Sequence, residues 1–159
     1  MLGTEEQKKL NIAIKTHWLI YLSFTSALII YTFVVFLVVK GGSAEPGKPG
    51  ILREVFFTVS MIFGVAKFWI QSRLLGGETS YEKCQNIDAI IQKYQSYNFI
   101  MLALCEVPAL LGLISTFMAR RIEVWWLFFA VSAILFATSA PQTGKLQSII
   151  QNHAARHQQ

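Results

Sequence analysis

The chain has 159 residues, of which 53% are hydrophobic and only 14% are charged, and its mean hydropathy is +0.45. This composition is too apolar for a soluble domain of the same size, so it excludes that class and indicates an integral membrane protein. The formal net charge of +5 favours contact with anionic lipid headgroups. No surface that mixes basic and aromatic residues is left over for a nucleic acid.

Four apolar segments are each close to the length of about 17–25 residues that a membrane helix needs. They cover residues 17–39, 55–71, 98–118 and 124–140. We therefore expect an all-α fold, an integral membrane four-helix bundle with antiparallel spans in a single domain over residues 1–159. The first segment is longer than the roughly 7–15 apolar residues of a cleavable signal peptide, so we expect it to stay as an anchor.

The first helix is expected to start well before the first span. Residues 4–7 (TEEQ) have the capping-box pattern of a helix start, and a helix that starts there can run without a break into the membrane. His17 stands where the span begins. It is interpreted as a polar residue at the interface rather than as a ligand.

Basic residues are distributed unequally between the two sides of the predicted bundle. With the N-terminus inside, nine fall on the cytoplasmic side and five on the outer side, which together make the 14 in the chain. The positive-inside rule then places both termini in the cytoplasm, and the predicted location is a bacterial inner membrane. Lys67 lies near the cytoplasmic end of the second span. We expect its amine to reach the interface, with burial against a carboxylate as the alternative.

A more polar segment separates the second span from the third. Residues 79–82 (TSYE) form a second capping-box pattern, and apolar residues recur after it at helical spacing as far as Tyr94. We expect an amphipathic cytoplasmic helix over about residues 79–95 that continues into the third span. It is interpreted as a solvated helix, with a regulatory or partner-docking role as the alternative. Residues 153–159 are predicted to be a frayed tail.

Glu106 lies near the centre of the third apolar segment, where a carboxylate is least expected. An ionisable group at that depth costs about 2.5–3.5 kcal/mol on insertion scales, so it is treated as a functional candidate. Pro108 cannot donate a backbone hydrogen bond and frees the carbonyl of Leu104 beside the acid. A carboxylate and a freed carbonyl could together bind a proton or a cation. Hydrocarbon disfavours charge, so we expect Glu106 to be protonated unless a cation pairs with it.

Three small residues of the same segment, Cys105, Ala109 and Gly112, follow one another at intervals of about one helical turn. Small side chains let a second helix approach closely. We therefore predict that this strip packs helices together. We also expect a homo-oligomer or a place in a larger membrane complex.

The run LCEVPALLGL from Leu104 to Leu113 resembles the ion-carrying helix of the c subunits (proteolipids) of rotary ATP synthases. In that helix a mid-membrane Glu or Asp is followed by a small residue and then by an apolar-apolar-Gly-Leu sequence. The run also resembles small, uncharacterised four-span bacterial membrane proteins with a Glu-x-Pro-Ala segment in their third span. The resemblance implies a proton or a monovalent cation at Glu106. Unlike the c subunits, the other spans here are rich in Phe, Trp and Ile rather than Gly.

A short internal similarity links the second span to the fourth. Residues 56–62 (FFTVSMI) and 128–134 (FFAVSAI) are identical at five of seven positions. This leaves open both a chance match between apolar segments and a duplication of two related hairpins. On the simplest register Ser26 stands opposite Glu106. It is therefore grouped with Glu106 and Pro108 as the predicted ion- or proton-binding set.

No nucleophile with an adjacent base, no phosphate-binding glycine loop and no paired carboxylates occur in the sequence, so an enzyme is not expected. It shows no metal-ligand spacing and no intramembrane pair of histidines, so no metal or other cofactor is predicted. Two functions are considered. The first is a structural or accessory subunit of a membrane assembly, and the alternative is a proton- or cation-translocating component that uses Glu106. In the first, Glu106 bonds a hydroxyl of another helix, from the set Thr25, Ser26, Ser60, Ser132 and Thr138.

Overall fold

The structure is a computed structural model that describes residues 4–41, 50–75, 81, 84 and 86–156. This part of the chain forms helices and turns and contains no β-strand. In chain order the elements are α1 (Thr4–Gly41), α2 (Ile51–Ile70), the π-helical turn η1 (Gln71–Leu75), α3 (Ile87–Ala119), α4 (Ile122–Ala137) and α5 (Thr143–Arg156). The predicted all-α class is confirmed.

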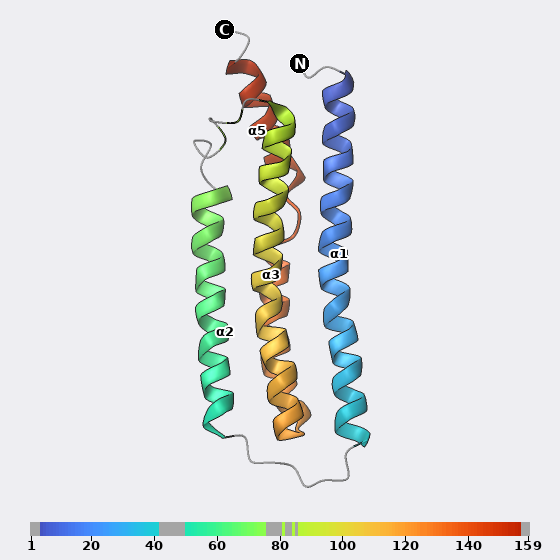
Figure 1. Ribbon diagram of the computed structural model, residues 1–159, viewed down its shortest axis with the longest axis vertical. Helices are drawn as coiled ribbons and strands as arrows, with labels where there is room; N and C mark the ends of the chain where they lie inside the picture. The colour runs from blue at the N-terminus through green and yellow to red at the C-terminus, as the bar shows by residue number, and fades with distance from the viewer. Residues whose placement is uncertain (1–3, 42–49, 76–80, 82–83, 85, 157–159) are drawn as a thin grey trace.

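The helices α1 to α4 pack as a bundle with α3 at its centre (Figure 1). α1 and α2 lie on opposite sides of α3, and α4 packs against α3 on the side away from the viewer. α1 and α3 begin at the end of the bundle that carries both chain termini, and α2 and α4 run in the opposite direction. We call this end, where the first turns of α1 and α3 and the whole of α5 lie, the terminal end.

Two helices, α1 and α3, are long and apolar enough to cross a membrane. α1 is continuous from Thr4, as its capping-box pattern predicts, and its 38 residues extend over about 57 Å at 1.5 Å per residue. That length exceeds the roughly 30 Å hydrocarbon core of a bilayer. α4 is apolar but has only 16 residues, and α2 includes the charged residues Arg53, Glu54 and Lys67.

Apolar side chains cover much of the outer surface of this bundle. On α1 the side chains of Leu19, Ile29 and Phe33 are 66%, 70% and 65% exposed, and Val65 on α2 is 70% exposed. Soluble monomers rarely expose apolar patches that extend so far. A surface of this kind is typical of helices that contact lipid or other membrane helices.

The terminal end has a core of its own, built by α1, α3 and α5. Its buried residues include Leu10, Ala13, Ile90, Tyr94, Leu146 and Ile150. Lys9 Nζ and Asp88 Oδ2 form an ion pair at 2.7 Å that joins α1 to α3 beside this core. Both side chains are exposed, so the pair aligns the two helices more than it stabilises the fold.

The prediction of a frayed C-terminal tail is wrong for the residues that the structure describes. α5 runs from Thr143 to Arg156, and residues 157–159 lie outside the described part. Leu146, Ile149 and Ile150 are spaced along one helical face and are buried in the core of the terminal end. This burial stabilises α5, whose apolar residues are interspersed among polar residues in the sequence.

α3 continues through the third apolar segment as predicted, but it begins at Ile87 rather than near residue 79. Asn86 sets this start, because its side-chain oxygen accepts a hydrogen bond from the N–H of Ala89 at 2.8 Å. Of the predicted start at residues 79–82, only Tyr81 lies within the described residues. Tyr81 is buried in the core of the terminal end, and burial raises its pKa.

The small residues Cys105, Ala109 and Gly112 are all buried inside the chain. A Cβ atom added to Gly112 would lie 2.4 Å from the Cβ of Phe128 on α4, so the missing side chain permits the close approach of the two helices. The strip therefore packs α3 against α4 of the same chain. It is not available as a contact between copies, which removes that argument for an oligomer.

The two hairpins suggested by the internal similarity pack differently. α3 and α4 lie against each other, whereas α1 and α2 are separated by α3. At the level of single residues the similarity is closer, because the equivalent serines Ser60 and Ser132 are both fully buried. The structure thus leaves the duplication open.

Two buried glycines provide a matched test of this packing. Gly112→Ala should lower the free energy of unfolding by about 1–3 kcal/mol, because the new methyl group overlaps Phe128. Gly64→Ala should raise it by about 0.5–1 kcal/mol, because its Cβ would meet Leu135 at an ordinary 3.7 Å and alanine favours the helix. Unfolding in mixed micelles, followed by circular dichroism, measures both. Equal effects of the two substitutions would contradict the packing described.

Candidate functional site

Glu106 lies in the middle of α3 and is partly buried against α1. The hydroxyl of Tyr31 on α1 donates a short hydrogen bond to Glu106 Oε1. The acid therefore has a partner on a neighbouring helix, and this partner is neither Ser26 nor another of the five hydroxyl groups considered from the sequence. Its position ties the central helix to α1 partway along their shared length.

The other two members of the predicted ion- or proton-binding set lie apart from this contact. Ser26 is exposed on α1, and its hydroxyl donates to the carbonyl oxygen of Ser23 at 2.8 Å. Pro108 is buried inside α3, which continues past it as one helix. The structure thus brings Glu106 together with Tyr31 rather than with Ser26.

Most of the hydroxyl groups considered as partners of Glu106 bond within their own helix instead. Thr25 donates to Tyr21, and Ser60 donates to Phe56. Short hydroxyl side chains in helices commonly bond to the carbonyl one turn earlier. A tyrosine is too long for this local bond, so its hydroxyl reaches a neighbouring helix.

A second buried polar group lies between α2, α3 and α4. Lys67 is fully buried, so the prediction that its amine reaches the interface is wrong. Its Nζ donates to the hydroxyl oxygen of Thr138 at 2.8 Å and lies 4.4 Å from the ring centre of Phe68. The alternative prediction, a pairing with a carboxylate, also finds no support, because no acid among the described residues forms an ion pair with it.

Lys67 belongs to a small polar cluster at the junction of three helices. Cys105 on α3 is close enough to interact with Lys67 electrostatically. Its Sγ lies 3.3 Å from the Oγ of Ser139, which follows Thr138 at the end of α4. Cys105 and Glu106 are neighbours in sequence but face different sides of α3, so one side carries the lysine cluster and the other carries the acid.

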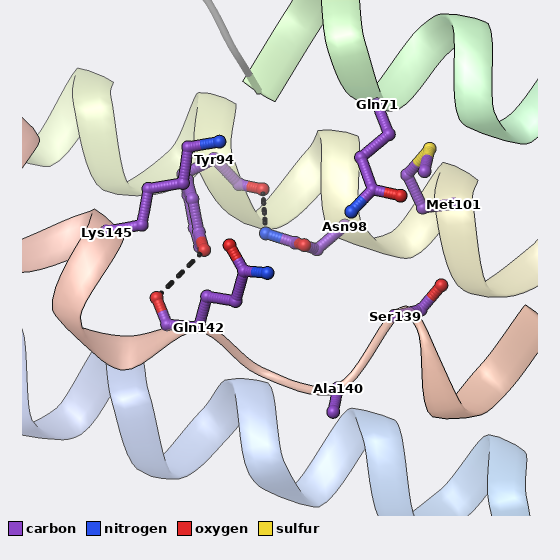
Figure 2. A pocket seen from close by; sticks show the side chains of 8 residues that line it. All are labelled: Gln71, Tyr94, Asn98, Met101, Ser139, Ala140, Gln142 and Lys145. Carbon is purple, nitrogen blue, oxygen red and sulfur yellow. Dashed lines mark hydrogen bonds between the residues drawn. The ribbon is translucent and has the colours of Figure 1, made fainter.

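A hollow opens beside this cluster at the terminal end (Figure 2). It is lined by Gln71, Tyr94, Asn98, Met101, Ser139, Ala140, Gln142 and Lys145, and its volume is about 20 Å³. This is room for about one water molecule and not for an organic ligand. The Oε1 atom of Gln71 is buried and has no hydrogen-bond partner in the described part of the chain, so it is available to such a water.

Hydrogen bonds hold the other polar walls of the hollow in place (Figure 2). Asn98 donates from Nδ2 to the carbonyl oxygen of Tyr94 at 2.8 Å, and the Tyr94 hydroxyl lies 3.5 Å from the carbonyl oxygen of Gln142. Burial raises the pKa of Tyr94, so its hydroxyl stays neutral. The hollow is therefore a polar surface without a carboxylate in its lining.

His17 packs next to this region, with its ring centre 5.8 Å from that of Tyr94. It is buried inside the chain, and its Nε2 atom has no partner among the described residues. Within the described ranges no group of three His, Cys, Asp or Glu side chains could hold a metal ion. Comparisons with family models, curated proteins and solved structures found no match to this chain.

The sequence alone did not show the roles of three residues in these two sites, Tyr31, Gln71 and Thr138. A tyrosine in an apolar span is readily interpreted as core, although its phenol is also a hydrogen-bond donor. Gln71 stands at the end of the second predicted span and has the appearance of an interfacial residue. Only the packing of α4 against α2 shows that Thr138 meets Lys67.

A double-mutant cycle should measure the contact between α1 and α3. Tyr31→Phe removes the donor and Glu106→Leu removes the acceptor, while both keep most of the side-chain volume. We expect a coupling energy of about 0.6 kcal/mol, the average for hydrogen bonds between membrane helices. Unfolding in mixed micelles gives the four free energies of the cycle. Strictly additive effects of the two substitutions would show that the hydrogen bond does not join the helices in the bilayer.

Proposed function

We propose that this chain is a four-span membrane protein of a bacterial inner membrane, with both termini in the cytoplasm, that serves as a structural or accessory subunit of a membrane assembly. The observation that carries this proposal is the hydrogen bond between Tyr31 and Glu106. It gives the mid-membrane acid a partner within the chain, which is what an acid with a structural role requires.

Spans for α2 and α4 are supported by their position beside the two long helices. Both helices are tightly packed against α3, so a bilayer that surrounds α1 and α3 also surrounds them. α2 exposes Ile62 and Val65 on its outer surface, and α4 exposes Ile134. The charges of α2 lie near its two ends, where headgroups or polar protein groups meet them.

The structural role is favoured over a transport role by the surroundings of Glu106. The hollow of about 20 Å³ and the adjoining cavity of about 10 Å³ lie at the terminal end, and neither has Glu106 in its lining. A transport acid must meet water or an exit path, whereas a structural acid is enclosed by protein. In this structure the acid meets the phenol of Tyr31.

A partner is favoured by the outer surface of α1. Only 11% of its most apolar 18-residue segment is buried inside the chain. Large aromatic residues such as Trp18 and Phe33 are exposed on it. Helix surfaces of this kind pack against lipid or against other membrane helices. A homo-oligomer and a larger complex both fit this surface.

A proton- or cation-translocating component is the second candidate, because Glu106 is only partly buried. An acid at the α1–α3 boundary is within reach of a neighbouring subunit. The weak resemblance to the c subunits of rotary ATP synthases points the same way.

Two substitutions of Glu106 separate the candidates. Glu106→Gln keeps the acceptor for Tyr31 but cannot ionise, and Glu106→Ala removes the acceptor. For a structural acid we expect Gln to behave as wild type, while Ala lowers the stability by about 0.6 kcal/mol or more and weakens assembly. Unfolding and native mass spectrometry measure these effects. If Gln folds and assembles normally but abolishes proton flux into liposomes, the structural proposal is wrong and the translocating function is correct.

The four-span topology is tested by the accessibility of two introduced cysteines. In a variant that lacks Cys84 and Cys105, Gly144→Cys should react with a membrane-impermeant thiol reagent only from the cytoplasmic side. Gly144 is exposed and has open space around it. Gly47→Cys, in the loop between the first two spans, should react only from the other side. Reaction of both from the same side would disprove the topology.

A further inference from the structure

The buried amine of Lys67 is only partly satisfied by its surroundings. An ammonium group has three N–H donors, and the described part of the structure provides one hydrogen bond, to Thr138 Oγ1 at 2.8 Å. A charged group without an acid nearby is costly to bury. The absence of an ion pair among the described residues therefore sets Lys67 apart from a lysine that serves as half of a salt bridge.

The groups that face Lys67 are arranged to accept a hydrogen bond or a positive charge. The hydroxyl proton of Thr138 is directed to the carbonyl oxygen of Leu135 at 2.9 Å, so its oxygen lone pairs face the amine. The ring of Phe68 offers its π face at 4.4 Å. These neutral acceptors fit a site that holds an ammonium for part of the time, and they argue against an anion as the ligand.

The hollow at the terminal end adjoins the segments that carry Lys67 and Thr138. Gln71, which lines the hollow, follows Lys67 by one helical turn, and its backbone N–H bonds to the Lys67 carbonyl oxygen. Ser139 lines the hollow from α4 and is adjacent in sequence to Thr138. A water molecule bound between the unpartnered Gln71 Oε1 and Ser139 would lie beside the residue next to Thr138, which accepts the hydrogen bond of Lys67.

The backbone at this point departs from a regular α-helix. α2 passes into the π-helical turn η1 at Gln71, directly after the segment that carries Lys67. π-helical turns are rare and occur frequently at functional sites. The turn places the Gln71 side chain in the wall of the hollow.

We propose that Lys67 is a proton-binding site inside the bundle, reached by water from the terminal end through the hollow between Gln71 and Ser139. The neutral amine takes a proton from a hydronium ion in the hollow, which leaves a water molecule behind. The ammonium then donates to Thr138 and lies beside Phe68. Release follows the same route in reverse, and the proton returns to water.

Other titratable groups face this route. Cys105 and Tyr94 approach it from α3, and Lys145 approaches it from α5. α4 contributes the neutral hydroxyl groups of Thr138 and Ser139. Glu106 is separate, because it faces α1 and bonds to Tyr31. The proposal goes beyond a structural role and does not depend on it.

Solid-state NMR of the full chain in lipid vesicles, with ¹⁵N at lysine Nζ, tests the proposal directly. One lysine signal should be lost in Lys67→Met, and in the wild type this signal should change reversibly between ammonium and neutral amine as the pH is varied. As a matched control, Lys15→Met removes an exposed lysine of α1 and should leave the Lys67 signal unaltered. A Lys67 signal that stays in one form over the whole pH range in which the bundle is folded would overturn the proposal.

The route is tested by removing the unpartnered polar group from the wall of the hollow. Gln71→Leu replaces the unpartnered amide with an apolar side chain of similar size, so the pH response of the Lys67 signal should be lost or greatly slowed. Circular dichroism of the same sample shows whether the variant is folded. If the folded variant responds like the wild type, water reaches Lys67 by another path and the proposed entry is wrong.

Discussion

The close approach of α3 and α4 at Gly112 is the constraint on which the rest of the bundle depends. A Cβ at this position would overlap Phe128, so the distance between the two helices is set by the lack of one side chain. α3 then carries the contacts with α1 and α2 on its remaining sides. With α3 at the centre, Glu106 and Cys105 on it meet different neighbouring helices.

This arrangement places Glu106 and Lys67 at two different boundaries of α3. Glu106 faces α1 and bonds to Tyr31, whereas Cys105, the preceding residue, faces the ends of α2 and α4 near Lys67 and Ser139. An acid and a lysine in one apolar helical bundle are readily assumed to pair. Here the rotation of about 100° between successive helical residues turns Cys105 and Glu106 to different sides of α3.

The sequence predicts the helices well because their signals are local. Apolar length and the capping box at residue 4 were sufficient for α1, and the helical face formed by Leu146, Ile149 and Ile150 would have shown α5. The partners of the candidate site are set by tertiary packing and could not be predicted in this way. Whether Lys67 extends to an interface or is buried depends on Thr138, 71 residues away in the chain. Likewise, a tyrosine becomes the partner of Glu106 only once α1 and α3 lie in register.

The continuity of α1 and α3 from the bundle into the terminal end has a mechanical consequence. Neither helix is interrupted between the bundle and the terminal end. At that end both helices share a core with α5, and the exposed Lys9–Asp88 pair aligns them. Each of these two helices moves as one rigid element along its whole length. A change of tilt between α1 and α3 in the bundle would therefore shear the core that both helices share with α5.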